Sequence, residues 1–441
     1  MLTRVFLSLA LLVAIPAWSQ VSTTDGGVGL AMTDQMQTPP PVSGEAYPTR
    51  VGSEKRSNYL RAGLTVVTAY SDNVLGNDDR PISELSYSIW PTIAFDKTIS
   101  RLHWSLTYNP GFTIYQRTRG FDQTNQNVAL DFLYRLSPHV TVTVQDSFIK
   151  TSNVFNQPEA LSEGAISGSG QSPLIPFIAP FANVLSNSAN AAIRYQFSRN
   201  SMIGANVTFT NLDYQTTVPG LNNSSSSGGS AFYSRRLSRN QYIGATYQYS
   251  EILAYSVNTR IAVQTNTVAG FYTIYLNRTF SLSFSGGQQH YGISESTVPA
   301  SGLWSPTLGA SMGWQGQRTN FSASYSRAIT AGGGLIGAFQ TNSVSASAQW
   351  QLARTWNLGS AASYSNNKNV TPAAFISTPA GGHFIIGTVS VQHPVREHFN
   401  VGFGYTRLHQ TYPGIPLISN APNANREFVS VAYQFARPLG R

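Results

Sequence analysis

The chain has 441 residues and a net charge of +9, yet only 11% of its residues are charged and none is cysteine, whereas roughly 25% are charged in an ordinary soluble domain. Its mean hydropathy of −0.14 shows that long apolar runs do not replace the missing charge, which disfavours both a helical membrane protein and an ordinary cytosolic enzyme. The lack of cysteine excludes disulfides, thiolate chemistry and lipidation at a cysteine.

Residues 1–19 have the three parts of a secretory signal peptide. Arg4 supplies a positive charge, residues 5–17 are apolar, and Ala17-Trp18-Ser19 precede Gln20. This apolar core is too short for a permanent bilayer anchor, so we expect cleavage just before Gln20. Residues 20–57 are rich in Ser, Thr, Gly, Pro and Gln without an apolar period, which predicts a flexible periplasmic segment.

From residue 58 to residue 436 the sequence repeats a strand, a short turn, a strand and a longer polar loop. An arginine recurs in the short turns about every 40 residues, and such a spacing normally indicates repeated architecture; these arginines are Arg199, Arg239, Arg278, Arg318 and Arg354. The strands alternate apolar with small polar residues, as Val344 and Ala346 do with Ser345 and Ser347. This alternation is typical of strands that face lipid on one side and water on the other.

We therefore predict an all-β fold: a single transmembrane antiparallel β-barrel over residues 58–436, followed by a short tail at residues 437–441. We expect about 18 strands, or 16 or 20 if one hairpin is merged or missed; an even number places both ends of the barrel in the periplasm. The protein is expected in the outer membrane, among its lipids and lipopolysaccharide. Strand-end aromatic residues such as Trp104 and Tyr195 predict interfacial girdles, the alternative being sugar-stacking platforms. The turn arginines are expected to mark the membrane boundary, the alternative being a role in selectivity.

Residues 152–186 form the longest insertion, and they are apolar where neighbouring loops are polar. Ile175, Phe177 and Phe181 are candidates for a constriction, because an apolar loop exposed to water is unfavourable. The loop is expected either to fold into the mouth of the barrel or to pack over its rim or against lipopolysaccharide.

Several charged residues have the strand phase of the barrel interior and are candidates for the pore lining: Arg61, His103, Asp131, Arg135 and Arg194. A basic lumen raises the local concentration of anions and guides acidic solutes. The alternative is a structural ladder in which Arg135 pairs with Asp131.

No catalytic, metal or cofactor site is predicted. The seven histidines are isolated, and none has a metal-ligand spacing such as His-x-x-x-His. Serine is too abundant for a nucleophile to be identified from spacing. Lysine and arginine are scattered or lie in turns, so nucleic acid is not an expected partner. We do not expect an enzyme.

Two short motifs resemble those of known outer-membrane proteins. Tyr70 at the end of the first strand is followed by Ser71 and Asp72-Asn73-Val74. This motif, together with the length and the strand-and-turn pattern of residues 58–436, resembles the β-barrel porins found with exopolysaccharide gene clusters. The resemblance implies a barrel that passes a nascent polysaccharide to the cell surface. Tyr433-Gln434-Phe435 is similar to the aromatic-ended signature recognised by the barrel-assembly machinery, although residues 436–441 extend past it.

The expected function is a passive conduit, with export of an exopolysaccharide as the first hypothesis. The second hypothesis is a general porin for small polar or anionic solutes, and the third is a structural or adhesive surface barrel that acts through its outer loops. Energised uptake is not expected, because residues 20–57 are too short to fold as a plug domain.

Overall fold

The computed structural model describes most of the chain from residue 58 onward, namely residues 58–74, 81–151, 183–215, 221–255, 260–277, 279–295, 298–332, 335–371, 381–413 and 423–438. The signal peptide at 1–19, the segment at 20–57, the end of the tail and the constriction candidates Ile175, Phe177 and Phe181 lie outside the described residues. Within these ranges no helix is both long enough and apolar enough to cross a membrane.

Eighteen strands follow one another within these described ranges, which confirms the predicted number. They are β1 (Tyr59–Ser71), β2 (Glu84–Ile99), β3 (Leu102–Tyr115), β4 (Gln123–Ser137), β5 (Val140–Thr151), β6 (Val184–Ser198), β7 (Ser201–Tyr214), β8 (Asn223–Ser238), β9 (Gln241–Tyr255), β10 (Arg260–Tyr275), β11 (Phe280–Glu295), β12 (Val298–Gln315), β13 (Thr319–Gly332), β14 (Leu335–Ala353), β15 (Trp356–Asn369), β16 (Gly382–Arg396), β17 (Phe399–Thr411) and β18 (Ala424–Pro438). One short 3-10 helix, Arg119–Phe121, lies between β3 and β4.

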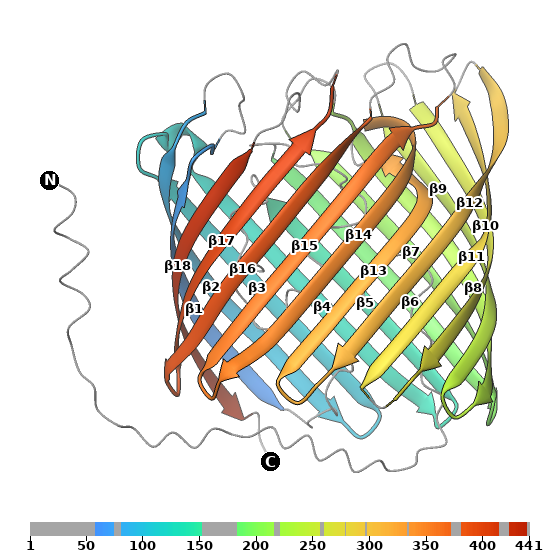
Figure 1. Cartoon of the computed structure of the whole chain (residues 1–441), viewed down its shortest axis with the longest axis horizontal. Coiled ribbons are helices and arrows are strands. Elements are labelled where there is room, and N and C mark those ends of the chain that lie inside the picture. Colours follow the sequence, from blue (N-terminus) through green and yellow to red (C-terminus); the bar gives the residue numbers. More distant parts are fainter. Residues whose placement is uncertain are drawn as a thin grey trace, which may run out of the picture.

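The strands form one closed antiparallel barrel. Each strand pairs with its neighbours in the sequence, and β1 pairs with β18 along its whole length, from Tyr59 opposite Pro438 to Ser71 opposite Arg426. Figure 1 shows the tilted strands around a single wall, with β1 beside β18. Closure matters in a bilayer because an open edge would leave backbone N–H and C=O groups without partners in hydrocarbon.

Short turns join each even-numbered strand to the next odd-numbered strand, and they all lie at the same end of the barrel. Ser198 and Ser238 explain the repeated Ser-Arg-Asn pattern, since their hydroxyl oxygens accept hydrogen bonds from the backbone N–H of Asn200 and Asn240, each at 3.3 Å. Such side-chain acceptors stabilise tight turns locally. In outer-membrane barrels the short turns face the periplasm, so we assign this end of the barrel to the periplasmic side.

The outer surface of the barrel is apolar. Val207 and Val268 are 64% and 61% exposed in the middle of their strands, and Trp350 is 50% exposed near the turns. In water such a surface would be costly, whereas in a bilayer it contacts acyl chains, and the aromatic side chains lie at the interfaces. The chain is an outer-membrane β-barrel.

The Asp-Asn-Val motif after β1 closes the seam between the first and last strands. The Asp72 carboxylate accepts hydrogen bonds from the backbone N–H and the side-chain Nδ2 of Asn425, at 2.7 and 2.6 Å. The Asp72 N–H donates to the Asn425 carbonyl at 3.1 Å, and Asn73 and Val74 are buried. The motif therefore fastens the two strands at the extracellular end, where no covalent turn joins them.

Candidate pore lining and mouth

All five residues predicted to line the pore have the inward phase of their strands. Arg61 shares its face of β1 with Val67, which is 1% exposed, while the lipid-facing Leu64 is 44% exposed. The register places the other four on the same inner surface, with His103 opposite Thr98, Asp131 opposite Ser105, Arg135 opposite Thr141 and Arg194 opposite Gly204. Their role in selecting solutes stays a prediction.

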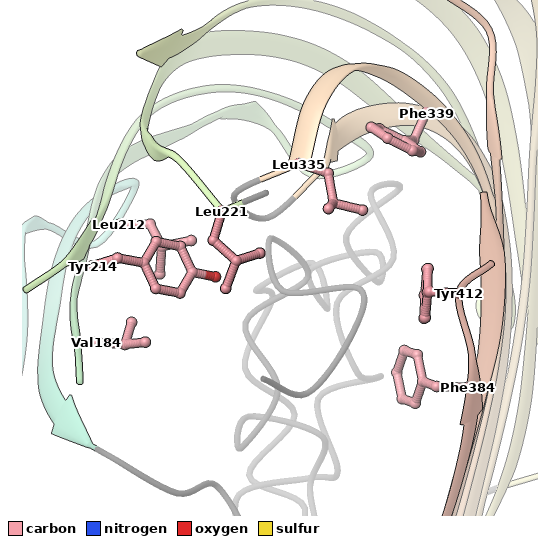
Figure 2. Close-up of a cluster of buried hydrophobic side chains, with 8 residues drawn as sticks. All are labelled: Val184, Leu212, Tyr214, Leu221, Leu335, Phe339, Phe384 and Tyr412. Carbon is pink, nitrogen blue, oxygen red and sulfur yellow. The ribbon is translucent and has the colours of Figure 1, made fainter. Parts of the chain in front are cut away.

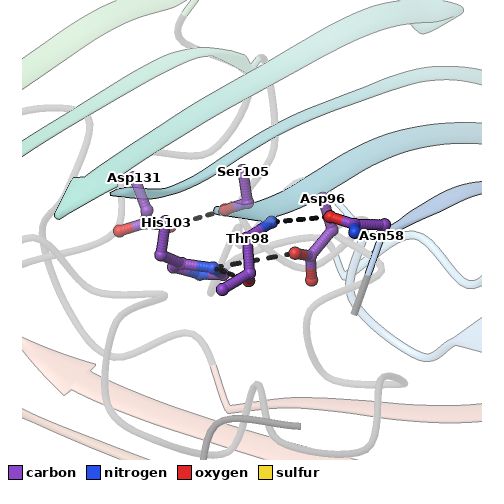
Figure 3. A network of polar contacts seen from close by, with 6 residues as sticks. All are labelled: Asn58, Asp96, Thr98, His103, Ser105 and Asp131. Atoms are coloured by element: carbon purple, nitrogen blue, oxygen red, sulfur yellow. Dashed lines mark hydrogen bonds and ion pairs between the residues drawn. The ribbon is translucent and has the colours of Figure 1, made fainter. Parts of the chain in front are cut away.

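A polar network lies on the inner wall near the periplasmic end (Figure 3). His103 Nδ1 lies 2.9 Å from Thr98 Oγ1 and 3.7 Å from Asp96 Oδ1. The Thr98 N–H donates to Asn58 Oδ1 at 2.9 Å, so the network also holds the residue that precedes β1. Asp96 was not identified from the sequence, although it has the same strand phase as Thr98.

Asp131 and Arg135 do not form the ladder considered from the sequence. Residues four apart on an extended strand are about 13 Å apart along the chain, too far for direct pairing. Asp131 instead accepts hydrogen bonds from Gln145 Nε2 at 3.0 Å and from Ser105 Oγ at 3.5 Å, both across neighbouring strands. This charge is thus held by neutral donors and remains exposed to the interior.

The inner wall formed by β13 and β14 is neutral and consists of small hydroxyl side chains. Paired hydroxyl groups form successive rungs between the two strands at 2.6 to 2.7 Å: Ser322 with Ser347, Ser324 with Ser345, Ser326 with Ser343 and Thr330 with Thr341. The three serine pairs are directly opposed, whereas Thr330 and Thr341 are diagonal neighbours, and side chains in both arrangements are close enough to bond. The order of the strands places this wall across the barrel from the charged wall of β1 to β6.

The extracellular end of the β13–β14 hairpin separates from β12 and lies inside the barrel, while β14 stays paired with β15 as far as Phe339 opposite Asn369. β12 extends from Val298, but its pairing with β13 begins only at Leu308, opposite Arg327. Beyond that point β13 still pairs with β14 up to Gly332 opposite Leu335. We call residues 329–332 and 335–340 the inner hairpin.

The inner hairpin is hydrogen-bonded to the inner faces of strands that are not its sheet neighbours. The Ile329 N–H donates to Gln289 Oε1 of β11 at 2.8 Å. The Gln340 side-chain amide bonds Ser305 Oγ of β12 at 3.1 Å. Gly337 has a φ of 118°, which a residue with a side chain rarely adopts, so glycine permits this part of β14 to bend.

Apolar side chains bury both faces of the inner hairpin. Ile329 and Ala338 pack against a row of residues on the inner wall of β9 to β11, namely Ile252, Ile261, Val263, Tyr291 and Ile293. Leu335 and Phe339 belong to a second cluster with Val184, Leu212, Tyr214, Leu221, Phe384 and Tyr412. Figure 2 shows Leu335 and Phe339 between residues of β7 on one side and Tyr412 and Phe384 on the other. The hairpin therefore narrows the extracellular mouth.

Tyr412, just beyond the end of β17, also ties this cluster to the β15 strand. Asn367 Nδ2 donates a hydrogen bond to the Tyr412 hydroxyl oxygen at 2.7 Å. Burial raises the pKa of this phenol above its ordinary value of 10, and the bond from Asn367 opposes that shift. The phenol is therefore neutral throughout the ordinary pH range.

Two features of the interior escaped the sequence analysis. The inner hairpin contains Gly332, Gly337 and other small residues, and the sequence analysis did not distinguish it from the longer polar loops that join the strands. Trp90 points inward and is 1% exposed, and its ring lies where a Cβ on Gly111 would be, at 2.1 Å. The sequence contained a signal for this packing, because a tryptophan at an inward-facing strand position lies opposite a glycine on the next strand.

No group of three or more His, Cys, Asp or Glu side chains within the described part of the chain could hold a metal ion.

The chain matches no protein-family model and no curated protein. Among solved structures, it is similar to Fiu of E. coli K12, a ferric-catecholate import receptor, with 10% identity, coverage of 85% of this chain and 81% of that chain, and a TM-score of 0.42. It is similar to OccAB4 of Acinetobacter baumannii, with 9% identity, coverage of 87% and 100%, and a TM-score of 0.41. OccK2 (OpdF) of Pseudomonas aeruginosa gives 9% identity, coverage of 86% and 98%, and a TM-score of 0.42. All three TM-scores are below 0.5, so the fold rests on the strand pairing of this chain itself.

Proposed function

We propose that this barrel is a passive channel for small polar solutes, with its extracellular mouth narrowed by the inner hairpin. The observation that carries the proposal is the position of that hairpin, held inside the wall by the Ile329–Gln289 hydrogen bond and by two apolar clusters. A passage restricted in this way suits compact solutes better than a polymer chain. The serine rungs of β13 and β14 supply hydroxyl groups but no charge along the path.

Inward-facing charges favour anions among those solutes. On the regular parts of the strands, inward-facing arginines outnumber inward-facing acidic residues: Arg61, Arg135, Arg194, Arg236 and Arg426 against Glu84, Asp96 and Asp131. A lumen with excess positive charge concentrates anions relative to cations. The preference should be moderate, because both signs are present and water screens them.

Export of an exopolysaccharide, which the sequence resemblance implied, would require the inner hairpin to leave the mouth. None of the contacts described above favours such a displacement, because the hairpin buries apolar side chains on both of its faces. We therefore prefer the small-solute hypothesis to the polymer hypothesis.

Swelling of proteoliposomes in sugars of increasing size tests this proposal. Vesicles that contain the refolded protein should swell quickly in a monosaccharide, more slowly in a disaccharide, and at the protein-free rate in a long dextran. Swelling at the protein-free rate in every sugar, with the protein shown to be folded and inserted, would contradict the proposal. Rapid passage of the dextran would favour the polymer conduit instead.

A further inference from the structure

An apolar groove lies on the outer surface of the barrel across β6 to β10, in its periplasmic half. Its volume is about 690 Å³, and Tyr195, Tyr233, Tyr247 and Val268 form its walls. Ala205, Ala231 and Ala245 form its floor, since their small side chains stand in register between these larger ones. The groove faces the bilayer, so any occupant must be a membrane molecule or a protein within the membrane.

Aromatic side chains bound the periplasmic end of the groove. The rings of Phe197 and Tyr233 are stacked with their centroids 6.4 Å apart, and those of Tyr195 and Phe197 are 6.3 Å apart. The Tyr233 hydroxyl lies 3.5 Å from Ser201 Oγ, toward the turn. Aromatic rings with polar tips occur where acyl chains meet headgroups, so this end of the groove lies at the level of the periplasmic headgroups.

Three exposed arginines lie just beyond that aromatic boundary. Arg235 follows Tyr233 by two residues on the same outward face of β8, a separation of about 7 Å, and Arg199 and Arg239 occupy the adjacent turns. No Asp or Glu occurs in residues 194–206 or 231–247, so no acidic side chain from these segments balances the charge.

We propose that the groove binds an acyl chain of an anionic phospholipid from the periplasmic leaflet, with the phosphate of its headgroup held by Arg235 and the turn arginines. Arginine suits this role because its guanidinium group forms paired hydrogen bonds with phosphate oxygens. A second copy of this chain is the less favourable occupant, since a symmetric contact through the groove would bring two sets of arginines together. The proposal concerns the outer surface and does not depend on transport through the lumen.

The test is native mass spectrometry of the purified full-length protein, with dioleoyl phosphatidylglycerol or dioleoyl phosphatidylcholine added in equal amounts. The natural protein should retain phosphatidylglycerol in preference to phosphatidylcholine. A231L combined with A245L fills the groove and should abolish retention of both lipids. R235Q combined with R239Q should weaken retention of phosphatidylglycerol by about tenfold and leave phosphatidylcholine unchanged, because each arginine near a membrane surface contributes about 1 kcal/mol toward an anionic lipid before screening.

Matched controls lie on strands outside the groove. A323L with A346L adds the same bulk to the outer surface of β13 and β14, and R318Q with R354Q removes two exposed turn arginines far from the groove. Both controls should retain lipid as the natural protein does. Equal retention of phosphatidylglycerol by the natural protein and the groove-filling variant would overturn the proposal, as would a dimer that the same variant abolishes without any change in bound lipid.

Discussion

The backbone N–H of Ile329 in β13 donates a hydrogen bond to Gln289 Oε1 in β11 at 2.8 Å, although β12 lies between these two strands in the wall. Such a bond is possible only because the inner hairpin has crossed to the interior. Gln289 is 5% exposed, so removing its side chain would leave a buried backbone donor without a partner. That loss costs about 1–3 kcal/mol, enough to change the population of the docked hairpin roughly tenfold.

We therefore predict that Gln289→Ala increases the fraction of time that single channels spend in a higher-conductance state, by about tenfold. The control is Gln288→Ala, because Gln288 faces outward on the same strand and is exposed. Single-channel recording at fixed voltage measures the fraction of time in the higher-conductance state for both variants. Identical records for Gln289→Ala and the natural protein would show that this bond does not hold the hairpin.

The strand phase of β14 gives a prediction about access from water. The chain contains no cysteine, so Ser345→Cys and Ala346→Cys each introduce a single thiol, one on the inner surface and one on the lipid surface. A charged, water-soluble methanethiosulfonate reagent should react quickly at position 345 and lower the conductance. At position 346 it should react slowly and have no effect on conductance. Equal reaction rates at the two positions would contradict the assigned phase.

Charge reversal inside the lumen should change ion selectivity. At about 10 Å in water one unit charge changes an ion's energy by roughly 0.4 kcal/mol, or a factor of about two in the permeability of that ion, with opposite signs for chloride and potassium. Arg194→Glu changes the charge by two units, so chloride permeability should fall about fourfold and potassium permeability should rise about fourfold. The ratio of chloride to potassium permeability should therefore fall about 16-fold at low ionic strength, and less where salt screens the charge. The reversal potential in a salt gradient measures this ratio.

Arg407→Glu is the control for this measurement, since Arg407 has the outward phase of β17 and is exposed. It should leave the reversal potential unchanged. If Arg194→Glu and Arg407→Glu shift the reversal potential equally, the effect comes from the surface of the protein and not from its lumen.

The seam between β1 and β18 predicts a stability effect at Asp72. Asp72→Ala removes two hydrogen bonds from a charged acceptor to Asn425, and we expect a loss of about 1–3 kcal/mol in the free energy of unfolding. Asp72→Asn keeps one oxygen acceptor and should lose less. Urea unfolding followed by tryptophan fluorescence measures both changes, and an unchanged midpoint for Asp72→Ala would show that the seam does not depend on this residue.

The barrel could be predicted from the sequence because its signals are local. The alternation of Val344 and Ala346 with Ser345 and Ser347 has the period of a strand, and the turns at Ser198 and Ser238 repeat the same hydrogen bond. Each signal fixes a strand or a turn without reference to distant parts of the chain. The inward phase of Arg61 and Arg194 followed from the same alternation.

The mouth could not be predicted in this way, because the position of the inner hairpin depends on contacts between distant segments. Nothing near Ile329 in the sequence indicates Gln289, which lies 40 residues earlier. Alternation also cannot show that a hairpin leaves the wall, since Ile329 keeps an outward phase while it packs against the inner face of β9 to β11. The long insertion with Phe177 was the expected constriction and lies outside the described residues.

The most direct test of a passive channel narrowed by the inner hairpin is single-channel recording in a planar bilayer. The refolded natural protein is compared with a variant in which a short Gly-Ser linker replaces residues 330–338. We predict a steady conductance for the natural protein, and a larger one for the variant, which should also admit polymers that the natural channel excludes. A folded and inserted natural protein without conductance, or a variant with the conductance and size limit of the natural protein, would contradict this function.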